Sequence, residues 1–196
     1  MKKSAFIILF LVLQCNSALL WAQTEPEEIK LDTDQFQELF YESLLQKGIE
    51  NYDKAIVALD KANKLKPNDA AVYYELGKNY LALKEYKSAY NYFENATKIN
   101  PKNKWFWIGM YDVSYETKNF TQGITVINKL IEFDPKYKED LTSLFMGTNQ
   151  YEKALALIQE LNETYGKTDR RELYKSQILS VGKFQNMEIT NLEDLI

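Results

Sequence analysis

The sequence predicts an all-α fold made of about five consecutive helix–turn–helix hairpins, and three observations support this prediction. Apolar residues recur three and four positions apart through most of the chain, which is the spacing of amphipathic helices. In the clearest stretch, 70–101, the apolar stripe is interrupted near residues 84–86, so this stretch contains two helices. Residues of this stretch return at an offset of 34 in the neighbouring segments, a period typical of stacked helical repeats.

The same stretch has the signals of a closed hairpin. Small residues such as Gly77 and Ala89 lie where two helix axes must approach closely enough to interlock. Asn68 or Asp69 can cap the first helix by accepting a backbone N–H bond, whereas Pro101 cannot continue the second helix. The hairpin therefore has a predicted start, turn and stop.

The array is expected to depart from this pattern at its two ends. In the first repeat, Phe36 and Phe40 belong to a stripe about one position out of register, which a shifted or slightly lengthened turn would restore. In the last repeat, Phe184 follows Tyr151 by 33 residues, but Asn191 stands where an apolar residue is expected. This end is expected to form a closing cap or to mark the loss of further repeats, since terminal repeats are often atypical. We expect one array over 34–196, with repeats at about 34–67, 70–101, 104–135, 136–165 and 169–196.

Residues 1–22 are predicted to be a secretory signal peptide. Lys2 and Lys3 precede an apolar run, and small residues follow it before an acidic, flexible leader expected at 23–33. Cleavage is expected after Ala22, with cleavage after Ala18 as the alternative. An uncleaved signal would instead anchor the chain, although its apolar run is shorter than the ~20 residues that a membrane span needs.

The cysteine content fits export to an oxidising compartment. Cys15 is the only cysteine and would be removed with the signal peptide. Its lipidation is disfavoured, because lipoprotein sites need a small residue before the thiol and Gln14 stands there. The mature protein is therefore expected to be periplasmic or secreted, without a disulfide and without a membrane span.

Charge and composition argue against nucleic acid binding and against catalysis. Without Lys2 and Lys3 the chain has 22 basic and 28 acidic residues, a net charge of −6, and no basic run that could follow a phosphate backbone. The chain has no histidine, so the commonest general base and metal ligand are missing. No phosphate-binding loop, nucleophile elbow or metal signature occurs either. We therefore expect no catalytic residues, no cofactor and no metal.

The repeated positions resemble those of the tetratricopeptide-repeat (TPR) family from about Asp34 to the C-terminus. This resemblance implies a right-handed superhelical solenoid of about five helix-turn-helix TPR hairpins, whose first helices line a concave groove and whose second helices form the convex back. In the family such a groove usually binds a peptide, a protein segment or a partner helix, and enzymatic activity is not implied. The residues that carry the resemblance in the second repeat are Tyr73, Leu76, Gly77, Tyr80, Ala89, Phe93, Ala96 and Pro101.

The resemblance also suggests which residues face the groove. Aromatic rings interleaved with single charges suit peptide recognition, because a ring buries area at low entropy cost while a charge fixes the register. Alternatively, Tyr74 and Ile108 only bridge adjacent repeats, and Trp105 and Tyr115 alone are exposed. Tyr74 and Ile108 also stand where chaperone-binding members carry clamp residues for a terminal carboxylate, so that ligand is not expected. The candidate groove residues are Tyr74, Lys78, Leu81, Trp105, Ile108, Asp112, Tyr115, Glu139 and Ser143.

Two functions follow as hypotheses. The first is an exported, non-enzymatic scaffold that binds a peptide or protein segment in its groove. The alternative is a structural or regulatory accessory that self-associates through its C-terminal repeat end, where the pattern decays.

Overall fold

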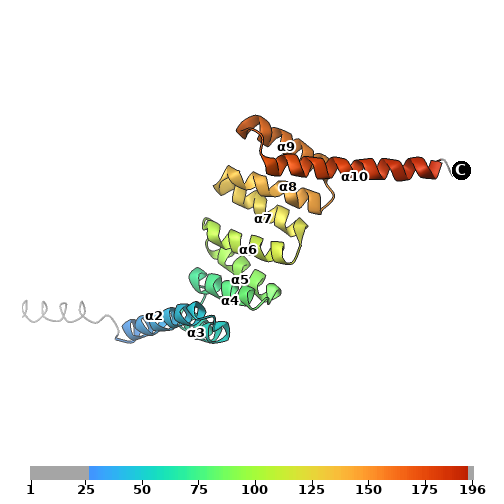
Figure 1. Cartoon of the computed structure of the whole chain (residues 1–196). Helices are drawn as coiled ribbons and strands as arrows, with labels where there is room; N and C mark the ends of the chain where they lie inside the picture. Colours follow the sequence, from blue (N-terminus) through green and yellow to red (C-terminus); the bar gives the residue numbers. More distant parts are fainter. Residues whose placement is uncertain (1–26, 194–196) are drawn as a thin grey trace, which may run out of the picture. The chain divides into compact units, whose positions relative to one another are not determined.

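The computed structural model describes the backbone of residues 27–193 and the side chains of residues 33–182. The expected signal peptide at 1–22 lies outside the described residues. Helices account for all regular structure in the described part, which confirms the all-α fold class. The helices, drawn in Figure 1, are α2 (Glu27–Gly48), α3 (Tyr52–Leu65), α4 (Ala70–Ala82), α5 (Tyr86–Ile99), α6 (Lys104–Glu116), α7 (Phe120–Phe133), the 3-10 helix η1 (Pro135–Tyr137), α8 (Lys138–Gly147), α9 (Tyr151–Tyr165) and α10 (Asp169–Glu193).

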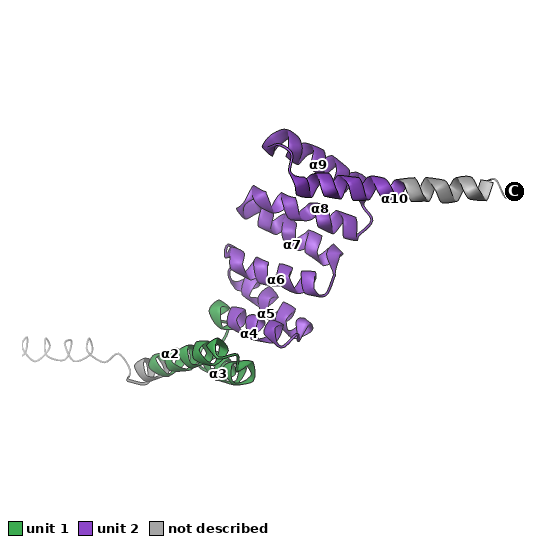
Figure 2. Ribbon diagram, in the orientation of Figure 1, with its two compact units in different colours: residues 1–72 green, residues 73–196 purple. Residues whose placement is uncertain are grey.

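The chain divides into two compact units, residues 1–72 and 73–196 (Figure 2). In the first unit α2 packs against α3, and Ser43 together with Ala55, Leu59 and Ala62 is buried. In the second unit, α5 to α9 pack on one another in chain order, and α10 packs on α8 and α9. This order of contacts is that of a repeat array, in which each element meets its neighbours along the chain.

Four hairpins share one turn geometry. Each turn has three residues, and its second residue adopts a positive φ of 53° to 62°. In the second hairpin this geometry lets the backbone N–H of Glu85 donate to the carbonyl oxygen of Tyr80 at 2.9 Å, which satisfies a helix-end carbonyl. The first hairpin has the same three-residue turn, so the shifted or lengthened turn expected there is wrong. The left-handed residues are Glu50, Lys84, Lys118 and Asn149.

The starts of α4 and α6 are capped by short polar side chains. Asp69 Oδ1 accepts the backbone N–H of Ala71 at 2.9 Å, so Asp69 caps α4, whereas Asn68 has a φ of 61° and forms the preceding turn. Asn103 Oδ1 accepts the N–H of Trp105 at 3.1 Å at the start of α6. These caps satisfy backbone donors that a helix leaves unpaired at its first turn.

The ring of Phe93 is held between two glycines. Phe93 lies on α5 and is fully buried. A Cβ atom placed on Gly77 of α4 would lie 2.7 Å from the ring, and one placed on Gly109 of α6 would lie 2.5 Å from it. Only glycine leaves room for this approach, so the ring joins its own hairpin to the next one. Gly109 therefore provides space in the third repeat, where Tyr111 occupies the position equivalent to Gly77.

The fifth hairpin expected at 169–196 is not formed. Residues 169–193 make one continuous helix, α10, and Gly182 lies inside it without a positive φ. Glycine permits a turn but does not impose one, because it populates helical and left-handed conformations alike. The leader expected at 23–33 is helical from Glu27 onward, although the sequence showed an apolar stripe only from Phe36.

No helix among the described residues combines the length and the apolar character needed to cross a membrane.

Replacing Gly109 with alanine tests the packing of Phe93. The added methyl group must displace a buried ring, and overpacking of this kind outweighs the gain in helix propensity, so the free energy of unfolding should fall by about 1–2 kcal/mol. Gly48→Ala is the matched control, because no atom lies within 4 Å of the added carbon. Urea unfolding measures both variants. A Gly109→Ala protein as stable as the Gly48→Ala protein would contradict this account.

Candidate functional site

Two adjoining hollows lie between α4 and α6, the first helices of successive hairpins. The hollows have volumes of about 290 and 390 Å³ and share Leu81, Ala82 and Asp112, so together they form one groove, called the α4–α6 groove below. The smaller hollow is lined by Tyr74, Lys78, Leu81, Ala82, Phe93, Ile108, Gly109 and Asp112. The larger is lined by Leu81, Ala82, Lys84, Tyr86, Asp112, Tyr115 and Glu116.

The helical repeat explains why these side chains meet. Residues 74, 78 and 81 follow each other at helical spacing on α4, and residues 108, 112 and 115 repeat this spacing on α6 at an offset of 34. Equivalent faces of two neighbouring helices therefore line the same hollow. Six of the nine candidate groove residues come together here: Tyr74, Lys78, Leu81, Ile108, Asp112 and Tyr115.

Tyr74 forms a fixed part of the groove wall. Its ring centroid lies 5.8 Å from that of Phe93 and 5.2 Å from that of Phe106, which belongs to the next hairpin. The Lys78 ammonium lies 5.2 Å from the Tyr74 ring centroid and 3.3 Å from Glu75 Oε1. Tyr74 thus bridges two repeats and also lines the groove, so the two alternatives considered for it are compatible.

The exposed aromatic residues differ in their position. Tyr115 is 62% exposed and lines the larger hollow, which gives the groove an accessible ring at its edge. Trp105 is 54% exposed but lines neither hollow, and the ammonium of Lys104 lies 5.2 Å from its ring centroid. Of the two rings, Tyr115 is therefore the one that a ligand in the groove can reach directly.

The two candidates on α8 lie outside the groove. Glu139 Oε1 lies 3.4 Å from Nε of Arg171, an α10 residue whose side chain is only 3% exposed. The Ser143 hydroxyl donates to the carbonyl oxygen of Asp140 at 2.9 Å. Helix α10 thus packs on this side of α8, and Glu139 and Ser143 serve packing and local hydrogen bonding.

Two carboxyl groups, Asp112 on α6 and Asp140 on α8, are ionised at an electrostatic cost. Loss of hydration raises the pKa of Asp112, and the negative charge of Glu116 raises it further. Burial likewise raises the pKa of Asp140, against the opposing effect of Arg170. Burial and the charge of Asp140 raise the pKa of Tyr111 to about 12, so this phenol stays neutral. No ion pair involves Asp112 or Glu116 in the part of the chain that the structure describes.

Six residues that line the groove were not among the candidates: Ala82, Lys84, Tyr86, Phe93, Gly109 and Glu116. Tyr86 opens the second helix of its hairpin and also lines the larger hollow. Glu116 follows Asp112 by four positions and so shares its helix face, a signal that could have identified it. Ala82 lines both hollows, but an alanine carries no signal of its own.

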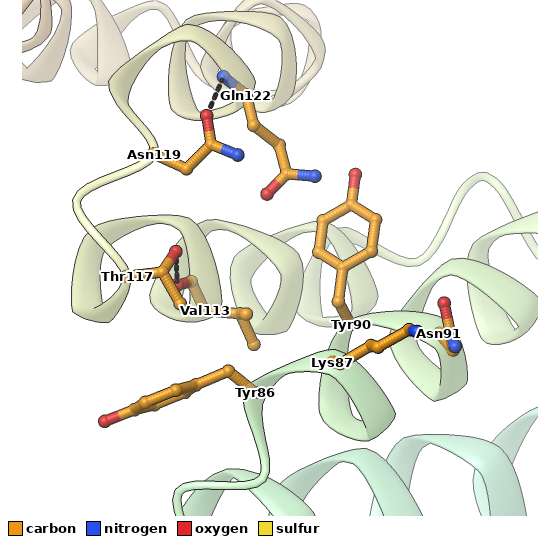
Figure 3. A pocket seen from close by; sticks show the side chains of 8 residues that line it. All are labelled: Tyr86, Lys87, Tyr90, Asn91, Val113, Thr117, Asn119 and Gln122. Carbon is orange, nitrogen blue, oxygen red and sulfur yellow. Dashed lines mark hydrogen bonds between the residues drawn. The ribbon is translucent and has the colours of Figure 1, made fainter.

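A third hollow, of about 440 Å³, lies beside Tyr86 between α5 and the end of α6 (Figure 3). Most of its lining residues carry polar groups, and several of these side chains already have local roles. Thr117 donates to the carbonyl oxygen of Val113, and Asn119 accepts the backbone N–H of Gln122 at the start of α7. This hollow reflects the capping of helix ends more than a shared recognition face.

Comparisons with known proteins agree with the repeat architecture. A family model described as anaphase-promoting complex, cyclosome, subunit 3, matches residues 48–130. No curated protein sequence matches the chain. The structure of YrrB, described as a TPR protein with an unusual peptide-binding site, is similar with a TM-score of 0.60 and 16% identity, over 74% of this chain and 76% of YrrB.

Two further structures have the same fold. MamA from Desulfovibrio magneticus RS-1 has a TM-score of 0.58 and 19% identity, over 81% of this chain and 96% of MamA. The first TPR domain of Spaghetti (RPAP3), bound to the HSP90 peptide SRMEEVD, has a TM-score of 0.54 and 13% identity, over 59% of this chain and 94% of that domain. The chain therefore has the fold of TPR proteins.

The Asp112→Asn variant tests whether the ionised Asp112 carboxylate destabilises the folded protein. A raised pKa means that the folded protein holds the Asp112 proton more tightly than the unfolded chain does, so the ionised group destabilises the fold at neutral pH. The variant should therefore have a higher midpoint temperature than the original protein at pH 7. The difference should fade below pH 3.8, the ordinary carboxyl pKa, where both side chains are neutral.

Asp134→Asn is the matched control, for which the opposite change in midpoint temperature is expected. Hydrogen bonds from Lys136 lower the pKa of Asp134, so its charge stabilises the fold above the ordinary carboxyl pKa. This variant should have a lower midpoint temperature at pH 7, and its deficit should shrink as the pH falls. Equal and same-signed shifts for the two variants at pH 7 would refute the assignment.

Proposed function

We propose that this chain is a non-enzymatic scaffold that binds a peptide or protein segment in the α4–α6 groove. The observation that carries the proposal is the groove itself, in which six side chains from equivalent positions of two repeats line one continuous hollow. Non-enzymatic protein interaction is the general role of TPR folds. The YrrB structure is described as a TPR protein with an unusual peptide-binding site. The Spaghetti structure is described as a TPR domain bound to a peptide.

The lining indicates the chemistry of the segment. Tyr74, Leu81 and Ile108 give the groove apolar walls that can bury an apolar side chain of the ligand. Asp112 and Glu116 stand at the same groove and repel each other, so a lysine or arginine of the ligand would relieve this repulsion. The groove is therefore suited to a segment in which a cationic residue follows or precedes an apolar one.

The same residues disfavour an acidic ligand. The Spaghetti domain is described as bound to SRMEEVD, a peptide with three acidic residues. In this chain Asp112 and Glu116 offset Lys78 and Lys84 in the groove lining, and Tyr74 and Ile108 stand where a carboxylate clamp would need polar or cationic side chains. The groove therefore lacks the cationic excess that would attract such a ligand.

The stability cost of Asp112 supports a role in recognition. A carboxylate that destabilises the folded protein contributes nothing to packing, and such residues are commonly found where function requires them. Tyr115 supports the same interpretation, since a large ring that is 62% exposed at a groove is a typical anchor for a partner.

Export is the second part of the proposal. The charged start, apolar run and small residues of 1–22 support a cleaved signal and a working place in the periplasm or outside the cell. The mature N-terminus, determined by mass spectrometry on protein from its own cells, should be Gln23, or Leu19 if cleavage follows Ala18. Recovery of the chain with Met1 retained would refute export by cleavage.

Tyr115→Ala tests binding in the groove. Truncation of an interface anchor typically costs about 2 kcal/mol or more, so crosslinked partner recovered from the native cells should fall by about 30-fold. Tyr165→Ala is the matched control, since Tyr165 is 64% exposed and lies on α9, away from the α4–α6 groove. Circular dichroism should show the same helicity in both variants. Undiminished capture by the Tyr115→Ala protein would contradict the proposed site.

A further inference from the structure

We infer that two copies of this chain exchange their C-terminal segments, so that residues 184–196 of each copy pack in the furrow between α9 and α10 of the other. This inference concerns a surface outside the α4–α6 groove and does not depend on the proposed function. It specifies which segment and which surface would form the contact in self-association through the C-terminal end.

The turn pattern indicates that 184–196 is a second helix of a fifth hairpin. In all four hairpins the left-handed residue stands two positions before the aromatic residue that opens the second helix, as Lys84 stands before Tyr86 and Asn149 before Tyr151. Gly182 stands two positions before Phe184, which follows Tyr151 by 33 residues. The left-handed position of the fifth hairpin is thus held by the residue that adopts this conformation most readily.

The length of the segment also fits. The second helices α3, α5, α7 and α9 have 14, 14, 14 and 15 residues. Residues 184–196 number 13, nearly the same length. Residues 184–196 are therefore enough for a second helix, and the described residues show no hairpin there.

The place for this helix is an open furrow beside α10. The furrow has a volume of about 440 Å³ and is lined on its apolar side by Leu155, Ile158 and Leu179. Leu179 is 49% exposed, because no second helix of the same repeat covers α10 in the described part of the chain. Asn162, which also lines the furrow, has a buried Oδ1 atom without a hydrogen-bond donor. An added helix would cover both the apolar strip and the unsatisfied acceptor.

Charge complementarity points to the segment itself as the occupant. The furrow is lined by Lys167 and Lys175 against one carboxylate, Glu163. Residues 184–196 contain three acidic residues, Glu188, Glu193 and Asp194, and no basic residue. The furrow and the segment 184–196 therefore carry opposite charges, in addition to the segment's match to the repeat register.

The continuous α10 makes the exchange intermolecular. A helix of 25 residues is about 37 Å long, and its second half cannot return onto the helix that precedes it unless it breaks. Because α10 is unbroken at Gly182, its second half can occupy such a furrow only on another molecule. In two copies related by a two-fold axis, the segment of each copy can occupy the furrow of the other, so the assembly closes as a dimer.

Disulfide trapping in the full chain tests the exchange. Lys175 and Asn191 are the positions equivalent to Gly77 and Phe93, which touch each other in the second hairpin. In a Cys15→Ser background, a mixture of the Lys175→Cys and Asn191→Cys proteins should form disulfide-linked heterodimers, and either protein alone should not. The mixture of Glu132→Cys and Asn191→Cys is the control and should stay uncrosslinked, since the Glu132 side chain is exposed on α7.

The double variant Lys175→Cys/Asn191→Cys separates the possible outcomes. Exchange predicts covalent dimers, whereas folding of the segment onto its own furrow predicts an internal disulfide in a monomer and would overturn the inference. Absence of any disulfide would overturn it as well.

Light scattering on the purified chain gives an independent measurement. The chain should have twice the mass of one copy, and a chain ending at residue 182 should have the mass of a monomer. Insertion of Gly-Asn-Gly after Gly182 should also give a monomer, because a longer connection lets the segment reach its own furrow. An unchanged mass in both altered chains would refute the exchange. The Tyr115→Ala protein should remain dimeric, so failure of the groove proposal and failure of this one can be told apart.

Discussion

The structure of the second unit depends on the close approach of Phe93 to two glycines. Because Gly77 and Gly109 have no side chains, helices α4 and α6 both reach the face of one buried ring, and their spacing is set by that contact. The same contact fixes the floor of the α4–α6 groove, since Phe93 and Gly109 line it. Packing and the candidate site are therefore parts of one arrangement, and a change at Gly109 would alter the width of the groove as well as stability.

The groove and the C-terminal furrow show two ways in which a repeat array presents a surface. In the groove, equivalent faces of two first helices lie next to each other and keep Tyr115 and Asp112 accessible. In the furrow, no second helix covers α10 within the residues that the structure describes, so Leu179 is exposed. The first surface is built by the repeat, and the second results from an interruption of it. The partners proposed for these two surfaces differ accordingly, a foreign segment for the groove and a second copy for the furrow.

Much of the fold could be predicted from the sequence because the repeat period fixes which residues are equivalent. The offset of 34 placed Tyr74 and Ile108 on matching faces, and the structure brings them to one hollow. The role of Gly109 could not be predicted in this way, since it depends on which side of α6 the Phe93 ring approaches. The ion pair of Glu139 could not be predicted for a similar reason, because its partner Arg171 belongs to a later helix whose packing no local pattern reveals. The straight course of α10 was missed because glycine at 182 is compatible with a turn and with a helix.

The position of Phe93 in the chain also bears on how the protein folds. Gly77 precedes Phe93 by 16 residues and Gly109 follows it by 16, so the central contact of the second unit closes only short loops. Contacts of such small sequence separation lower the entropy cost of the transition state and favour rapid folding. The second and third repeats can thus serve as a nucleus from which order spreads toward both ends, and the outermost helices should be the first to fray.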